Sequence, residues 1–392
     1  GELNVDAGLV TGQVDEPASI AGGCICCLPD DGALDVALTR LGDPRGALNT
    51  YQEVLRRKPG DAGAVGALEE MARSENPLKG EAASTLEPVF ANEGEHLKLV
   101  QMIEAQVGSE PQPAERAALL RKMSEIYSQQ MDNAEMAFVA ATRALRELPD
   151  EPKNLALCSL LYKAADARDE YSTLLSEIAP KASDDQARAN LYRALAKLQT
   201  EANEPEEAVE SWKQVMSLAP TDGEAMEHIG KLLATQGRVP ELIDVLKRQL
   251  NIEEDTTRRV GLLFQMGVLQ DEQLNDAAAA LTTFRRLLEL APADANALAR
   301  MDGLCEDQQR WPELADVLGR RAAIVSAEEK PAILFKLGVV RETRLLDKSG
   351  AIELYSELLA QNARHPGALQ RLERLELLAA LVELLRELPQ FL

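Results

Sequence analysis

The chain has 392 residues, of which 45% are apolar and only 4% aromatic, and its formal net charge is −23. This acidic excess argues against nucleic acid as a partner, because phosphate binding depends on Lys and Arg neutralising the backbone. No hydrophobic run reaches membrane-spanning length, and no positively charged leader precedes an apolar stretch. These features predict a soluble cytoplasmic protein with neither nucleic-acid nor membrane partners.

Residues 1–40 contain a cluster of cysteines that the rest of the chain lacks. Three of the five cysteines fall within four positions, at Cys24, Cys26 and Cys27. In a strand, alternate residues share a face, so Cys24 and Cys26 can point to one side. Two neighbouring thiolates suit a soft metal such as zinc, and a carboxylate, a histidine or another chain would have to complete the usual four ligands. The three cysteines are therefore candidate metal ligands, and zinc is the one cofactor that the sequence raises.

The segment Gly23-Cys24-Ile25-Cys26-Cys27, preceded by Gly1-Glu2, resembles the GCxCC motif of CobW-type metallochaperone GTPases. The resemblance implies a metal-binding role for the three cysteines. The family's phosphate loop is missing from the chain, so the resemblance gives no support to nucleotide hydrolysis. Two interpretations stay open for residues 1–40: a cap on the end of the helical array that follows, or a fragment joined to an unrelated array.

From about residue 41 a single pattern repeats to the end of the chain. Alanines recur at intervals of 71, 72 and 71 residues, with a bulky side chain four residues later in most copies and a proline twelve residues later in all but the last. Such a period predicts stacked helical repeats. The alanines are Ala137, Ala208, Ala280 and Ala351; the fourth positions hold Ala141, Trp212, Phe284 and Tyr355; the prolines are Pro149, Pro220 and Pro292, with Pro366 three residues late in the last copy.

An earlier copy of the pattern, from Ala47 to Pro59, lies 90 residues before Ala137, which leaves room for one extra helix over 77–92. Each unit of about 72 residues reads as two antiparallel helix pairs, because apolar residues at i, i+4 and i+8 share one helical face. We therefore expect about five such units over residues 41–392. The repeat alanines, including Ala208 and Ala280, should be buried where helices approach closely.

Half of this period is close to the roughly 34 residues of a tetratricopeptide repeat, and Met266-Gly267 with Ala280, Phe284 and Pro292 has that family's spacing. Residues 43–392 therefore resemble a tetratricopeptide-repeat array. The resemblance implies an all-α fold, a right-handed superhelix or solenoid, whose groove binds a protein or peptide. We expect a non-enzymatic interaction scaffold, and the alternative is a zinc-handling protein whose repeats recruit a client.

The remaining candidates favour structural roles. Cys158 and Cys305 sit at core spacing within helices, and Trp212 and Trp311 occupy packing positions of the repeat. The histidines, His96, His228 and His365, stand in different units with no catalytic constellation around them. We therefore predict no catalytic residue.

The C-terminal stretch carries no polar capping helix, which repeat arrays usually need. In the repeat frame, the residues after Pro366 form a final helix pair. We expect an exposed apolar strip around Leu381, Leu385, Leu388 and Phe391, and self-association through it.

Overall fold

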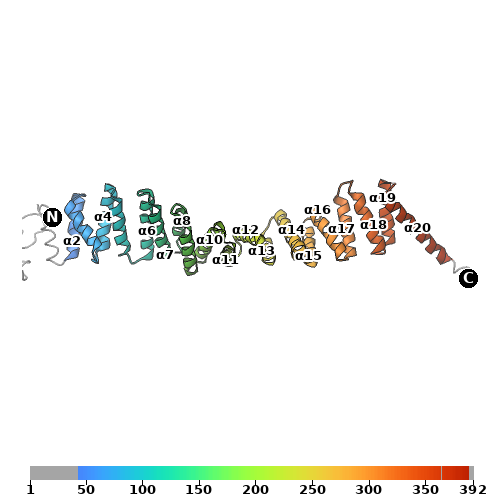
Figure 1. Ribbon diagram of the computed structural model, residues 1–392, viewed down its shortest axis with the longest axis horizontal. Coiled ribbons are helices and arrows are strands. Elements are labelled where there is room, and N and C mark those ends of the chain that lie inside the picture. The colour runs from blue at the N-terminus through green and yellow to red at the C-terminus, as the bar shows by residue number, and fades with distance from the viewer. Residues whose placement is uncertain (1–42, 363, 388–392) are drawn as a thin grey trace, which may run out of the picture. The chain divides into compact units, whose positions relative to one another are not determined.

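The computed structural model describes residues 43–362 and 364–387, which are largely helical (Figure 1). Their contacts divide them into two compact units, with the boundary between Ala219 and Pro220. No strand occurs within these ranges, so the predicted all-α repeat fold is confirmed. None of the helices found there combines the length and the apolar character that a bilayer-spanning segment needs.

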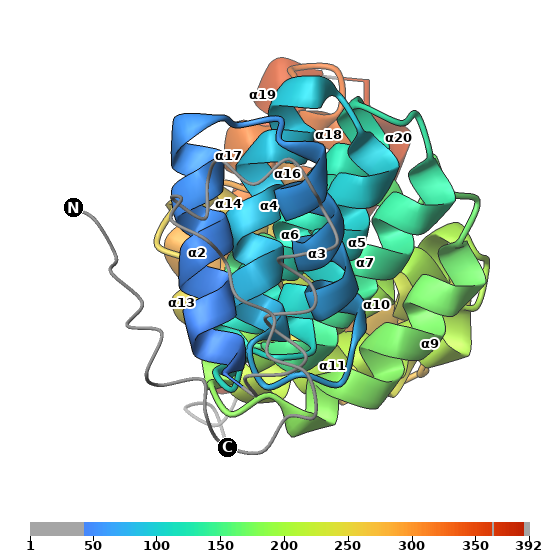
Figure 2. The same cartoon turned by 90° about the vertical axis from the view of Figure 1, so that its left-hand side faces the viewer.

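The first unit consists, in its described part, of antiparallel helices that pack mainly on helices one or two places away along the chain. Figure 2 shows α2, α3 and α4 standing side by side. The elements are α2 (Pro44–Arg57), α3 (Ala62–Arg73), α4 (Lys79–Glu93), α5 (His96–Val107), α6 (Pro113–Gln129), α7 (Ala134–Glu147), α8 (Pro152–Leu161), α9 (Arg168–Ile178), the short 3-10 helix η2 (Ala179–Lys181), α10 (Asp185–Glu201) and α11 (Pro205–Leu218). Four α-helices lie between α2 and α7, whereas three lie between α7 and α11. The first interval therefore contains one additional helix, and α4 lies where the sequence predicts it.

The second unit follows the same plan of helix pairs packed on their neighbours. Its helices are α12 (Gly223–Thr235), α13 (Val239–Ile252), α14 (Thr256–Glu272), α15 (Ala277–Leu290), α16 (Ala295–Asp307), α17 (Trp311–Ile324), α18 (Lys330–Thr343), α19 (Lys348–Gln361) and α20 (Pro366–Glu387). Its core is formed mainly by Leu and Ala with a few rings, as the low aromatic content predicts.

The repeat alanines lie where the sequence places them. Ala137, Ala208, Ala280 and Ala351 are all fully buried, and so are the rings of Trp212, Phe284 and Tyr355 that follow three of them. A glycine of the preceding helix lies against two of these rings, because a Cβ built on Gly267 or on Gly338 would lie 2.6 Å from the ring of Phe284 or Tyr355, respectively. Small residues thus let each pair close around its aromatic side chain.

The turns inside the helix pairs share a backbone feature that the periodicity did not reveal. Each contains one residue in the left-handed region, with φ between 49° and 72°. Gly, Asn and Asp reach this region most easily. The residues, in chain order from the α4–α5 turn to the α18–α19 turn, are Gly94, Asp132, Asp166, Asn203, Gly237, Asn275, Gln309 and Leu346.

The C-terminal prediction is partly wrong. The residues after Pro366 form one continuous helix, α20, where the repeat frame predicts a pair. The stretch contains neither Gly nor Pro between Ala368 and Glu387, so nothing in it interrupts a helix. Leu377 and Leu378 of α20 are exposed, but the side chains of Leu381 and Leu385 and all of Leu388 and Phe391 lie outside the described part.

Candidate binding pocket of the first unit

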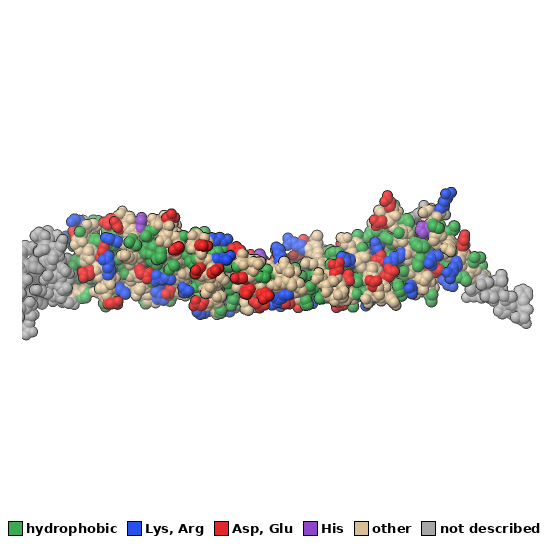
Figure 3. All heavy atoms as spheres, viewed as in Figure 1, with side chains coloured by type: hydrophobic (Ala, Val, Ile, Leu, Met, Phe, Trp, Pro, Cys, Tyr) green, Lys and Arg blue, Asp and Glu red, His purple; other side chains and the backbone are tan. Residues whose placement is uncertain are grey.

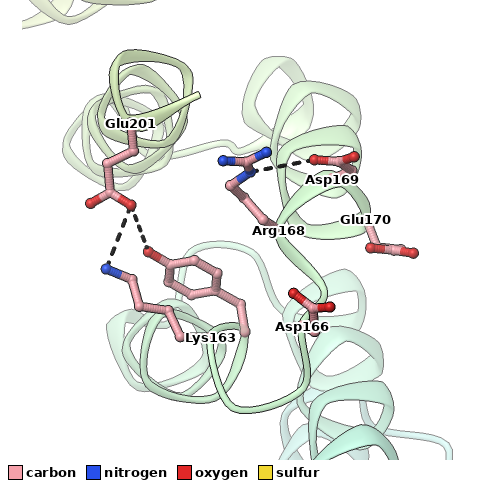
Figure 4. Close-up of a pocket in the computed structure, with 7 residues that line it drawn as sticks. Lys163, Asp166, Arg168, Asp169, Glu170 and Glu201 are labelled. Atoms are coloured by element: carbon pink, nitrogen blue, oxygen red, sulfur yellow. Dashed lines mark hydrogen bonds and ion pairs between the residues drawn. The ribbon is translucent and has the colours of Figure 1, made fainter. Parts of the chain in front are cut away.

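The first unit has a polar cavity of about 500 Å³ where the α8–α9 turn faces the end of α10 (Figure 4). Asp166 occupies the left-handed position of this turn, with φ 49°. The chain therefore reverses within a few residues, and the residues on either side of the reversal face one cavity. Its lining consists of Tyr162, Lys163, Asp166, Arg168, Asp169, Glu170 and Glu201.

One wall of the pocket is held together by Glu201. Its Oε2 accepts a hydrogen bond of 3.3 Å from the Tyr162 hydroxyl and lies 3.5 Å from Lys163 Nζ. The ammonium group of Lys163 also lies 5.5 Å from the centre of the Tyr162 ring. The hydrogen bond with Tyr162 and the negative charge of Glu201 raise the pKa of Lys163, so this side chain is a cation at neutral pH.

The Tyr162 ring is a fixed part of this wall. It is buried, and its centroid lies 5.2 Å from that of Tyr171, which itself donates or accepts a hydrogen bond of 2.8 Å with Ser159. Ring stacking and this hydrogen bond keep the two tyrosines in place. This wall of the pocket therefore has a buried aromatic pair behind its charged side chains.

The opposite wall is the first turn of α9, which carries Asp169 and Glu170. Carboxylates are favourable there because the N-terminal end of a helix has a partial positive charge. Arg168 Nε lies 3.4 Å from Asp169 Oδ1, and the Asp169 side chain is 90% exposed. No ion pair of Asp166 or Glu170 occurs in the described part of the chain. The lining thus has four carboxylates against two cations, and two of its carboxylates remain available to a ligand.

A second hollow of about 420 Å³ lies on the neighbouring α10–α11 pair and also has acidic side chains in its lining. Gln199, Glu206, Glu207, Glu210 and Ser211 line it, and Ser211 Oγ donates to Gln199 Oε1 at 2.7 Å. Figure 3 shows carboxylate side chains gathered over this end of the first unit.

The residues singled out from the sequence lie elsewhere. Cys24, Cys26 and Cys27 lie outside the described residues, and the zinc site stays a prediction. Cys158 and Cys305 are buried, and burial raises the pKa of each thiol to about 12, so both are protonated and unreactive. His365 caps α20, accepting a hydrogen bond at Nδ1 from the Ala368 N–H. Within the described ranges, no three His, Cys, Asp or Glu side chains gather as metal ligands would.

Sequence reasoning missed the pocket. The acidic residues of the α8–α9 turn form a visible run, but Glu201 lies more than thirty positions further along the chain. Only the packing of α8, α9 and α10 brings these residues together. A run of charge in a turn between repeat helices is therefore the one signal that could have directed attention here.

Comparison with known proteins agrees with the helix-pair description over one pair. Residues 262–294 match the sequence profile of the tetratricopeptide repeat, a range that runs from within α14 through α15. No curated protein sequence matches the chain. The resemblance of residues 1–40 to CobW-type proteins finds no support in these comparisons.

Solved structures that resemble the chain include several repeat proteins. YrrB, a tetratricopeptide-repeat protein with an unusual peptide-binding site, is 18% identical over 46% of this chain and 90% of its own, with a TM-score of 0.29. MamA from Desulfovibrio magneticus is 19% identical over 45% of this chain and 97% of its own, with a TM-score of 0.26. The C-terminal part of a tetratricopeptide-repeat protein from Cytophaga hutchinsonii is 12% identical over 75% of this chain and 99% of its own, with a TM-score of 0.29.

Proposed function

We propose that the chain is a non-enzymatic cytoplasmic scaffold that binds a protein or peptide partner, and that a lysine or arginine of the partner enters the pocket between α8, α9 and α10. The observation that carries the proposal is the lining, in which Asp166 and Glu170 have no cation of the described part to neutralise them. Lys163 already lies over the buried Tyr162 ring, so the carboxylates supply the attraction for a further cation. A basic side chain would therefore gain ion pairing with Asp166 and Glu170.

The test is a titration of the protein with a short fluorescent peptide of Lys and Ser, followed by anisotropy. A peptide of equal length in which Glu replaces Lys is the reference. We expect the basic peptide to bind, the acidic peptide not to bind, and the affinity to fall between roughly 0.05 M and 0.5 M NaCl, because salt screens exposed charges.

Variants locate the site. Asp166→Asn and Glu170→Gln should each weaken binding by about two- to five-fold, the range expected for one exposed ion pair. Glu125→Gln is the matched control, since Glu125 is an exposed carboxylate on α6, outside the pocket lining. Equal losses in all three variants would show that the peptide senses only net charge, and the pocket assignment would then be wrong.

A further inference from the structure

Lys163 lies in the pocket much as the proposed function expects a partner's lysine to lie. Its ammonium group is 3.5 Å from Glu201 Oε2 and 5.5 Å from the centre of the Tyr162 ring. Figure 4 shows the Lys163 side chain directed at Glu201 and away from Asp166 and Glu170. Glu201 is therefore an acid of the pocket that the chain's own lysine already neutralises.

The second unit contains the same kinds of group in a closed arrangement. Glu342 Oε2 accepts there from the Tyr355 hydroxyl at 3.0 Å and from Arg371 Nη1 at 2.7 Å, and the Glu342 side chain is 9% exposed. In the pocket the corresponding distances are 3.3 Å and 3.5 Å, and the side chains of Glu201 and Lys163 are 51% and 66% exposed. Exposed ion pairs are weak because water solvates both partners and salt screens them. Lys163 can therefore leave Glu201 at low cost.

We propose that Lys163 is an internal competitor, which occupies Glu201 until a basic side chain of the partner displaces it. The role rests on the proposed function, in which Asp166 and Glu170 receive the basic side chain, and it gives that side chain a third carboxylate. Lys163 lies in the turn after α8 with most of its side chain in water, so rotation of the side chain frees Glu201 without moving a helix. The affinity of the pocket for a basic segment is thus lower than its carboxylates alone would give.

Titration of variants with the fluorescent peptide of Lys and Ser tests the proposal. Lys163→Gln removes the competing charge and should tighten binding by about two- to five-fold, the range expected for one exposed ion pair. Lys163→Arg keeps a cation beside Glu201 and should bind as the wild type does. Lys153→Gln is the matched control, because Lys153 is an exposed lysine of α8 outside the pocket lining, and it should leave the affinity nearly unchanged.

A second background separates competition from a general change of charge. The Glu201→Gln chain has no carboxylate at this position for Lys163 to occupy, so most of the gain from Lys163→Gln should disappear in it. Circular dichroism should show the wild-type helix content in these variants, since the side chains of Lys163 and Glu201 are both more than half exposed.

Two results would overturn the proposal and leave the proposed function standing, provided that the wild type binds the basic peptide. One is a Lys163→Gln chain that binds no tighter than Lys153→Gln, and the other is a gain of equal size with and without the Glu201 carboxylate. If neither the wild type nor Lys163→Gln binds the peptide, the proposed function fails, and the role of Lys163 fails with it.

Discussion

At the scale of the residue, the helix pairs depend on a small residue facing a large one. Tyr355 illustrates the cost of disturbing this arrangement: its ring lies against Gly338, and its hydroxyl donates to Glu342 Oε2 at 3.0 Å, which also accepts from Arg371 at 2.7 Å. Glu342 is nearly buried, so these two donors satisfy a charge that would otherwise be costly. A shift of the ring therefore weakens contacts among α18, α19 and α20 together.

Gly338→Ala should lower the free energy of unfolding by about 1–3 kcal/mol, the usual cost of overpacking, even though alanine favours a helix. Gly303→Ala is the matched control, because Gly303 lies in α16 with open space around its Cα, and it should raise the free energy of unfolding by about 0.5–1 kcal/mol. Urea denaturation of the two variants measures both effects. A neutral Gly338→Ala would mean that Tyr355 relaxes at no cost.

At the scale of the element, packing decides where helices end. The helices that carry the repeat alanines, α2, α7, α11, α15 and α19, all have 14 residues. Four of them are followed by a proline two residues past the end, but α19 is not. Its cap, Asn362, nevertheless has φ −140°, close to the −141° of Lys58 at the end of α2. The proline therefore reinforces an end point that does not require it.

The turn residues allow a prediction on stability. Leu346→Asn should raise the free energy of unfolding by up to about 1 kcal/mol, because asparagine occupies the left-handed region at lower cost than leucine does. Asn275→Leu in the equivalent α14–α15 turn should lower it by a similar amount. Thermal unfolding of the two variants beside the wild type measures both effects. A destabilised Leu346→Asn would show that the leucine serves the fold.

Asp150 links two turns and predicts a dependence on pH. It accepts hydrogen bonds from the Ser183 hydroxyl and from the backbone N–H of Ser183 at 3.0 Å and of Asp184 at 3.3 Å. The Ser183 hydroxyl, followed by these N–H groups, outweighs partial burial and holds the pKa of Asp150 below its ordinary value of 3.8. A depressed folded-state pKa stabilises the fold above the unfolded-state pKa, and this contribution disappears as the pH falls through the folded-state value.

Asp150→Asn should therefore be less stable than the wild type at pH 7, and the difference should narrow as the pH falls below about 4. Urea denaturation of both chains at several pH values between neutral and acidic measures this difference. A difference that stayed constant across the series would show that the charge of Asp150 contributes nothing.

At the scale of the whole molecule, stability arises from neighbouring helices. In each unit the substantial packing joins helices one or two places apart along the chain. Repeat arrays of this kind have stabilities that are close to sums over neighbours.

A chain of residues 43–219 should accordingly fold by itself. We expect strong helical circular dichroism and a cooperative thermal transition, because its core clusters draw on helices within that range. A fragment that is unfolded in buffer would contradict the description of residues 43–219 as a compact unit.

The sequence by itself determined the fold class, the helix pairs and the burial of the repeat alanines. Periodicity carries this information because residues such as Ala280 and Phe284 share a helical face, and their partners lie within one repeat. The repeat pattern predicted a turn after Pro366, but α20 is one continuous helix there. The prediction failed because the sequence of α20 contains no residue that favours a turn at that point.

Only the tertiary structure decided the rest. The pocket brings Glu201 to Tyr162 and Lys163 across an intervening helix, and no local pattern encodes that distance. The sequence did not predict the left-handed backbone of Leu346 either, because the residue type leucine does not indicate a positive φ. The structure shows both this φ and the exposure of the side chain. The period of the sequence predicts contacts within a repeat, because those residues are close along the chain. The pocket depends on how separate helices pack, and the period does not predict that.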